Sequence, residues 1–254
     1  MMAAERTTKI LEIINATGAV KVEQLAKELG VSEMTIRRDL EKCDKNGSLQ
    51  RCHGGAILKS NIQREMDYDE KRQTHQGAKR HIAAACAQMV EEGSTVYLDA
   101  GTTTFEIAQL IQSISNLTIL TNDLLIAASL LKSDVELIVL GGEVQKSTGS
   151  MIGNIAQQIM ENMRVDISFM GTMSIDDSFN SLSPTIEKAF LKRMITQNSN
   201  KSYLVADASK FSQQALIKIN SLSDYTGVVT NKEFTSAELR LIREKNINII
   251  SVSD

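Results

Sequence analysis

The sequence predicts two domains: an α/β domain with a mainly parallel sheet, preceded by a small α+β domain of the winged helix-turn-helix type. Residues 77–254 alternate short apolar segments with helical periodicity, which is typical of parallel strands joined by helical crossovers. Residues 1–58 contain three helical patterns, a glycine turn and a glycine-tipped hairpin. A chain of 254 residues can hold both domains, and we expect residues 59–76 to link them.

The composition excludes several classes of protein. Hydrophobic residues make up 42% and charged residues 23%, as in ordinary globular proteins. No run approaches the roughly 18 apolar residues that span a bilayer, and the first residues lack a secretion signal, so we expect a cytoplasmic protein with no membrane partner. The three cysteines show no paired C-x-x-C spacing, so neither a disulfide framework nor a metal site is expected.

The first domain begins with two predicted helices and a tight turn. Apolar residues give Arg6–Ala16 one apolar face, Val20–Val22 fits a short strand, and Glu23–Leu29 fits a second helix. Gly30 supplies the left-handed conformation that ends a helix, and Ser32 stands where the next helix needs an N-cap.

The third helix and the hairpin complete the domain. Ile36, Leu40 and Cys43 recur at helical spacing and predict a buried face, and Gly47 is expected to end the helix. Ser48–Cys52 and Ala56–Leu58 predict a hairpin, joined by the residues HGG. This order of elements is the one that presents a helix to the major groove of DNA and braces it with a wing.

Polar and basic residues lie where such a helix and wing would meet DNA. Arg37 and Arg38 can contact guanine or clamp phosphates, and the first-turn hydroxyls can bond a phosphate or a base edge. The predicted DNA-binding residues are Ser32, Thr35, Arg37, Arg38, Lys42, Arg51, His53 and Gly54. Taken alone, Arg37–Asp39 would fit a solvated helix face with an ion pair, and His53 a structural turn residue. The capped turn, the apolar rear and the wing occur together, which favours DNA, and the net charge of −3 does not exclude a basic docking face.

These residues also resemble a known family. The pattern RxxKI at residues 6–10, LAxxLGVSxxTIRRDL at 25–40 and HGGA at 53–56 resemble the winged helix of DeoR-family bacterial transcription regulators. Cys43 departs from that pattern, where an aliphatic residue is usual. The resemblance implies sequence-specific binding to double-stranded operator DNA.

The segment between the domains has two interpretations. Residues 59–76 are polar, charged and weakly periodic, which indicates a linker, partly helical at most. The alternative is a solvated helix packed along the second domain.

The second domain has a regular alternation of predicted elements. Strands are predicted at Thr95–Leu98, Thr118–Leu120, Glu136–Leu140, Ile167–Met170, Tyr203–Ala206, Thr226–Val229 and Asn248–Val252. Helices are predicted at Lys79–Glu91, Thr104–Ile114, Leu124–Leu131, Ile155–Met163, Glu187–Gln197 and Ser236–Glu244.

Several predicted strands end in residues suited to binding a small molecule. Ligands of open α/β sheets collect at the carboxyl ends of the strands. The richest end runs from Asp99 through Gly101 to Thr104 and straight into a helix, whose unpaired amides would suit a phosphate. Asp99 can accept bonds from sugar hydroxyls, and lysines can supply charge. A single Gly-Thr-Thr, the Gly141–Gly142 pair and Lys210 each have plainer structural explanations, so it is the repetition at several strand ends that indicates a pocket.

The second domain resembles the DeoR-family sensor domain. The resemblance is carried by DxGTT at 99–103, TN at 121–122, LGG at 140–142, DxxFxG at 166–171, KRMI at 192–195 and DxSKF at 207–211. It implies a fold similar to ribose-5-phosphate isomerase and CoA transferases, and a phosphorylated sugar as effector. The implied effector-binding residues are Asp99, Gly101, Thr102, Thr103, Thr104, Thr121, Asn122, Gly141, Gly142, Lys146, Lys192, Asp207 and Lys210. The family pattern is broken within Ser174–Ala189, where Lys188 replaces a glutamate.

These observations predict a DNA-binding repressor of a sugar-utilisation operon, released by a phosphorylated sugar. We expect a homodimer or homotetramer, because one small helix makes too few contacts. The alternative is an enzyme resembling a sugar-phosphate isomerase with a DNA-binding module. The sequence shows no nucleophile-and-base pair, metal cluster or cofactor fingerprint, so we expect neither catalysis nor a cofactor. Activation rather than repression stays open, since operator position decides it.

Overall fold

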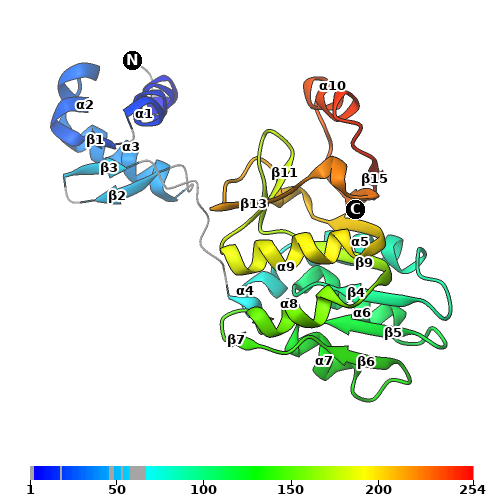
Figure 1. Ribbon diagram of the computed structural model, residues 1–254. Coiled ribbons are helices and arrows are strands. Elements are labelled where there is room, and N and C mark those ends of the chain that lie inside the picture. Colours follow the sequence, from blue (N-terminus) through cyan, green and yellow to red (C-terminus); the bar gives the residue numbers. More distant parts are fainter. Residues whose placement is uncertain (1–2, 18, 46–48, 53, 58–66, 254) are drawn as a thin grey trace. The chain divides into compact units, whose positions relative to one another are not determined.

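The computed structural model describes residues 3–17, 19–45, 49–52, 54–57 and 67–253. The chain divides into two compact units, residues 1–61 and 62–254, and each is described by itself (Figure 1). The expected helix end at Gly47, the wing residue His53 and residues 59–66 of the expected linker lie outside the described residues.

The smaller unit has the predicted winged helix-turn-helix order. Its helices are α1 (Ala3–Thr17), α2 (Val22–Leu29) and α3 (Glu33–Lys45), and its strands are β1 (Ala19–Lys21), β2 (Gln50–Cys52) and β3 (Gly55–Ile57). The strands form an antiparallel sheet in the order β1-β3-β2, so the hairpin β2–β3 is the wing.

The core of this unit lies behind α3. Ile36, Leu40 and Cys43 are buried, as their spacing predicts, against residues of α1 and α2. Asp39 is buried too, and its carboxylate accepts from the Arg6 guanidinium at 2.5 Å. The idea of a solvated Arg37–Asp39 ion pair is therefore wrong: Asp39 points inward and ties α3 to α1.

The larger unit holds the remaining elements. Its helices are α4 (Tyr68–Gln73), α5 (Gln76–Ala87), α6 (Thr102–Ile111), α7 (Leu124–Leu130), α8 (Asn154–Glu161), α9 (Ile186–Gln197), α10 (Ser236–Glu244) and the 3₁₀ turns η1 (Ala208–Lys210) and η2 (Leu222–Asp224). Its main strands are β4 (Thr95–Leu98), β5 (Thr118–Thr121), β6 (Glu136–Val139), β9 (Val165–Gly171), β12 (Ser199–Val205), β14 (Gly227–Thr230) and β15 (Ile249–Ser251).

These main strands form one parallel sheet in the order β15-β14-β12-β9-β4-β5-β6. The chain enters at β4 and winds outward through β5 to β6, then returns to the other side of β4 and winds outward from β9 to β15. The strand order therefore reverses between β4 and β9. In open α/β sheets such a reversal opens a crevice at the carboxyl ends of the strands.

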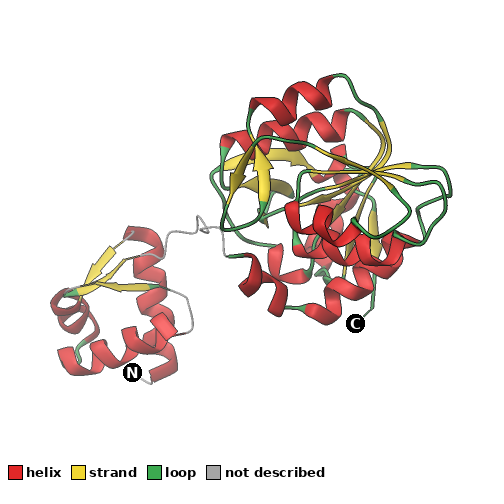
Figure 2. Ribbon diagram, turned by 90° about the horizontal axis from the view of Figure 1, so that it is seen from below, coloured by secondary structure: helices red, strands yellow, loops and turns green. Residues whose placement is uncertain are grey.

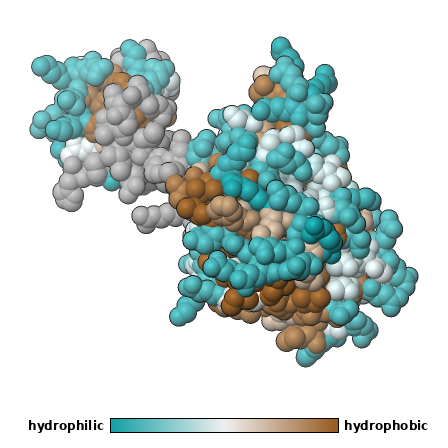
Figure 3. All heavy atoms as spheres, viewed as in Figure 1, coloured by the Kyte–Doolittle hydropathy of each residue, from teal (hydrophilic) through white to brown (hydrophobic). Residues whose placement is uncertain are grey.

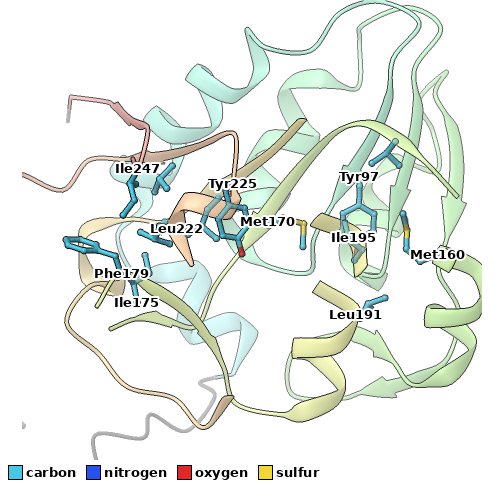
Figure 4. Close-up of a cluster of buried hydrophobic side chains, with 14 of the residues drawn as sticks. Tyr97, Met160, Met170, Ile175, Phe179, Leu191, Ile195, Leu222, Tyr225 and Ile247 are labelled. Atoms are coloured by element: carbon cyan, nitrogen blue, oxygen red, sulfur yellow. The ribbon is translucent and has the colours of Figure 1, made fainter. Parts of the chain in front are cut away.

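Helices cover both faces of the sheet (Figure 2). Alternate residues of β4 face opposite cores: Val96 and Leu98 pack with α5, α6 and α7, whereas Tyr97 packs with α8, α9 and α10. Figure 4 follows the second core from Tyr97 and Met160 to Phe179 and Ile247. Burial on both faces explains why these strands appear in the sequence as continuous apolar segments.

Two smaller strand groups were not predicted. β7 (Glu143–Gln145) and β8 (Ser150–Ile152) form a hairpin, and β10 (Ser174–Ile175), β11 (Asn180–Ser183) and β13 (Ile217–Ser221) form an antiparallel sheet. Helix α4, with Tyr68 buried, lies within the residues expected to be a linker, as the alternative interpretation allowed. None of the helices in the described ranges is long and apolar enough to cross a membrane.

Candidate functional site

The turn before α3 is built as the sequence indicates. Gly30 has a φ of 66° and its amide donates to the carbonyl of Ala26, which closes α2. The Ser32 hydroxyl oxygen accepts from the Thr35 amide at 3.3 Å and lies 3.0 Å from the Thr35 hydroxyl. Ser32 is thus the N-cap of α3, and both hydroxyls lie at the helix end that would enter a groove.

The solvent side of α3 carries the predicted basic residues. Arg37, Arg38 and Lys42 are exposed, and Arg37 donates to the exposed Glu33 carboxylate at 3.1 Å. An exposed pair of this kind is worth at most about 1 kcal/mol, so Arg37 can exchange it for DNA at small cost. The sequence reasoning missed Met34, which is 62% exposed in the first turn; an apolar side chain at a polar-face position was the available signal.

The wing is held against the helices by its backbone. Gly54 has a φ of 84°, and its carbonyl accepts from the Val22 amide at 2.9 Å. At Gly55 a Cβ would lie 2.0 Å from the Val20 carbonyl oxygen, so only glycine fits against β1. Arg51 is exposed on β2.

The larger unit contains a pocket of about 300 Å³ at the reversal of strand order. Its wall includes the carboxyl ends of β4, β9 and β12, the first turn of α6, and parts of α4, α5 and α9. Lysines outnumber the acidic residues in this wall. The charged residues that line it are Lys71, Lys79, Lys188, Lys192, Lys210, Asp99 and Asp207.

Asp99 joins the two strands at the reversal. Its buried carboxylate accepts from the Gly171 amide at 2.8 Å and from the Lys192 ammonium, which also donates to the Gly171 carbonyl at 2.9 Å. A Cβ on Gly171 would lie 3.3 Å from the same carboxylate. The ends of β4 and β9 are therefore fixed to each other and to the middle of α9.

The first turn of α6 presents unpaired amides to the pocket. Thr102, Thr103 and Thr104 begin the helix, and no acceptor among the described residues takes their backbone N–H groups. The Thr104 hydroxyl caps the loop by donating to the carbonyls of Asp99 and Gly101 at 2.6 and 2.8 Å. Amides and helix dipole together favour an anion.

The loop before α6 is held from behind by Asp123. Its carboxylate accepts from the Gly101 amide at 3.0 Å and from two amides of α7. Burial raises the pKa of Asp123 to about 6, although these amide donors act in the opposite direction. Asp123 thus joins the loop to the start of α7.

Asp207 carries an unsatisfied acceptor. One carboxylate oxygen accepts from the Ser209 amide at 2.9 Å and caps η1, whereas the other has no hydrogen-bond partner although the residue is 2% exposed. A buried acceptor without a partner is costly, so a ligand donor is well suited to it. Burial lowers the pKa of nearby Lys79 to about 8; Asp207 raises it and Lys210 lowers it further.

The pocket brings together most of the predicted effector residues. Those that line it are Asp99, Gly101, Thr102, Thr103, Thr104, Asn122, Lys192, Asp207 and Lys210. The Asn122 side chain is already used, accepting from Tyr97 at 2.8 Å and Ala100 at 3.1 Å and donating to Met151 at 3.0 Å.

The other predicted effector residues lie outside the pocket lining. Thr121 is buried, and its hydroxyl donates to the Leu98 carbonyl. Gly141, Gly142 and Lys146 follow the edge strand β6, away from the reversal between β4 and β9. At Gly142 a Cβ would lie 2.3 Å from the Ile152 carbonyl oxygen, so this glycine allows close approach to β8.

Sequence reasoning missed several pocket residues. Lys71, Thr74 and Lys79 come from the segment interpreted as a linker and from the start of α5, and Thr172 and Lys188 from the β9 and α9 ends. A lysine at the start of a helical pattern gives no sign of burial. The departure at Lys188 was the one available signal.

Both units of the chain match known protein domains. Residues 6–61 match the family model for the DeoR-like helix-turn-helix domain, and residues 74–232 match that for the DeoR C terminal sensor domain. The HTH-type transcriptional regulator GlpR of Haloferax volcanii is 30% identical over 98% of both chains. The glycerol-3-phosphate regulon repressor of Escherichia coli is 32% identical over 98% of this chain and 99% of its own. A putative aga operon transcriptional repressor of Escherichia coli O157:H7 is 30% identical over 99% and 94%.

Two solved structures of low sequence identity align with part of the chain. Ribose 5-phosphate isomerase from Plasmodium falciparum aligns at a TM-score of 0.39, with 16% identity over 54% of both chains. The delta subunit of eIF2B from Chaetomium thermophilum aligns at 0.47, with 16% identity over 64% of this chain and 58% of its own. The family matches and the named relatives confirm the prediction of a transcription regulator rather than an enzyme.

Proposed function

Because this chain belongs to the DeoR family of DNA-binding transcription regulators, we propose that it represses a sugar-utilisation operon and leaves its operator when a phosphorylated sugar binds the pocket of the larger unit. The observation that carries this proposal is the lysine-rich pocket at the strand reversal, with the open amides of α6 in its wall. Relatives named as repressors of a glycerol-3-phosphate regulon and an aga operon support the kind of operon.

The phosphate group belongs at the first turn of α6. Thr102, Thr103 and Thr104 offer backbone N–H groups there, and a helix N-terminus with open amides is a general anion site. Lysines elsewhere in the wall supply positive charge that the two aspartates do not balance. A phosphate dianion would offset that excess.

The sugar portion would meet the carboxylates. Sugar hydroxyls donate hydrogen bonds, and carboxylates accept them. The acceptors in the pocket would be the carboxylate oxygen of Asp207 that has no partner and the carboxylate of Asp99. A ligand with hydroxyls beside a phosphate satisfies both kinds of group at once. An uncharged sugar would leave the lysines uncompensated, and an anion without hydroxyl groups, such as sulfate, would leave Asp207 without a donor.

At the operator, α3 reads the major groove. Arg37 and Arg38 would contact guanine or phosphates, the hydroxyls of Ser32 and Thr35 would bond to the backbone or a base edge, and Met34 would contact a thymine methyl group. Lys42, Arg51, His53 and Gly54 complete the proposed DNA-binding set.

We also propose that the chain works as a homodimer or homotetramer, because a single helix-turn-helix covers one half-site. Apolar side chains are exposed on the first residues of α7 and α8 and on β7, and Figure 3 shows apolar atoms gathered around these elements. These side chains are Leu124, Leu125, Val144 and Ile155.

Calorimetric titration of the full chain with a panel of sugar phosphates tests the pocket. One compound should bind the wild type. The Lys192→Met variant should bind that compound much more weakly, because Lys192 is fixed at the strand reversal. The matched variant Lys146→Met, on the β7–β8 turn outside the pocket lining, should bind like the wild type. Equal binding by Lys192→Met, or weaker binding by Lys146→Met alone, would contradict the proposed site.

A further inference from the structure

Helix α4 is the first described element after the segment that leads from the DNA-binding unit. It is also part of the pocket: Lys71 on α4, and Thr74 and His75 just after it, line the wall. The first described helix of the larger unit therefore borders the proposed ligand.

One side chain holds the end of this helix. Lys79, in the first turn of α5, is 4% exposed, and its ammonium donates to the carbonyls of Lys71 and, at 2.7 Å, Thr74. Carbonyls at the end of a helix have no partner within it. Lys79 thus caps α4 from the neighbouring helix.

The same ammonium lines the pocket. An ammonium has three N–H donors, and two of those on Lys79 go to the carbonyls. No acceptor among the residues described takes the third. The charged groups around it are Asp207, Lys210, Glu106 and Lys71, two carboxylates and two ammonium groups, so Lys79 itself makes the cluster positive by one charge. The pocket lining as a whole holds five lysines and two aspartates, which suits an anion.

We propose that Lys79 couples ligand binding to α4: an anionic group of the ligand accepts its third hydrogen bond while the other two hold α4 to the pocket. This inference rests on the proposed function and adds a connection from the pocket to α4. A bound anion keeps the ammonium charged, and hydrogen bonds from a charged donor are stronger than those from a neutral amine. The ligand therefore fixes α4, which is the first described element after the segment that joins the two units.

Other contacts keep α4 in place when Lys79 is changed. The Tyr68 amide donates to the Ser147 carbonyl at 2.9 Å, and the Arg72 guanidinium lies 5.2 Å from the centre of the Phe105 ring on α6. A Lys79 variant should accordingly fold, with α4 attached at its first turn and along its side but not at its end.

Hydrogen exchange of the full chain, with inorganic phosphate in excess or chloride at equal ionic strength, tests the coupling. In the wild type we expect phosphate to slow amide exchange in the first turn of α6. It should also slow amide exchange in α4 about tenfold, which is the effect expected from one charge-assisted hydrogen bond. In Lys79→Met the amides of α6 should still slow, whereas α4 should exchange faster than in the wild type and no longer respond. Lys210→Met, which removes another pocket lysine, should keep the response of α4 at a higher phosphate concentration.

Two results would overturn the coupling alone. One is protection of α6 without any change in α4 of the wild type; the other is an equal response of α4 in Lys79→Met. Either result would refute the coupling but leave the proposed phosphate site in place. Absence of protection at both α6 and α4 would refute the proposed phosphate site and the coupling together. Unchanged exchange at Ile82 and Cys86, buried in α5, confirms that each variant is folded.

Discussion

At the scale of single residues, Lys79 is a pocket lysine whose charge changes just above physiological pH. Its pKa is lowered to about 8, chiefly by burial, and Asp207 opposes that shift. A phosphate ester has its second pKa near 6 and keeps its charge above pH 7. Ligand binding favours the charged lysine, so effector affinity should fall as the pH rises from about 7 to 9. Calorimetry across this range measures it, and Lys79→Met should flatten the dependence; the same slope in that variant would assign the titration elsewhere.

Arg37 is the corresponding residue at the DNA interface. Its side chain is half exposed and forms an ion pair with the exposed Glu33 carboxylate. Arg37→Ala should therefore leave folding and ligand binding intact. Loss of one bidentate base contact costs about 1–3 kcal/mol, so operator affinity should fall roughly 5- to 150-fold. Competition assays with operator and unrelated DNA check this. The control Lys201→Ala removes one exposed charge from β12 and should change little; equal losses in both variants would mean that net charge alone matters.

At the scale of elements, the main strands and their helices could be predicted because each strand is short, apolar and followed by a polar or glycine residue. Their order could not, since it depends on distant pairings such as Val96 with Ile167. The position of the pocket follows from that order. This is why Gly141 and Lys146, after an edge strand, resembled pocket residues in the sequence, while the buried Lys79 resembled a solvated one.

The small sheet β10–β11–β13 escaped prediction for a related reason. Its strands are short and rich in serine and asparagine, and their burial depends on partners such as Tyr225, which lies 3.0 Å from the Ser181 hydroxyl. The N-terminal unit was easier, because Gly30, Ser32 and the Ile36–Leu40–Cys43 face mark its elements locally.

Two glycines show how local and tertiary demands differ. Gly30 has a φ of 66° with open space around its Cα, so Gly30→Ala should cost only backbone strain, about 1 kcal/mol. Gly142 has a φ of 142° and faces the Ile152 carbonyl, so Gly142→Ala should cost more because the β7–β8 hairpin must move. Calorimetric unfolding of the full chain should show the larger loss for Gly142→Ala. If that variant unfolded at the same temperature as the wild type, the close contact between Gly142 and the Ile152 carbonyl would be refuted.

At the scale of the whole molecule, an operator of two half-sites requires two chains. Ile155, 58% exposed among the apolar side chains of α7, α8 and β7, is the natural residue to test. Ile155→Asp should shift sedimentation toward the monomer and weaken operator binding, because two linked half-site contacts bind far better than one. The control Leu241→Asp alters an exposed leucine on α10. A wild-type monomer, or equal effects of the two variants, would contradict this interface.

The central claim is that ligand in the larger unit controls DNA binding by the smaller one. Fluorescence anisotropy on DNA from upstream of the protein's own gene, at fixed salt and with a panel of sugar phosphates, tests it most directly. The predicted result is tight, salt-sensitive binding that one sugar phosphate relieves in the wild type but not in Lys192→Met. Tight binding that the effector bound in calorimetry leaves unchanged would contradict the account.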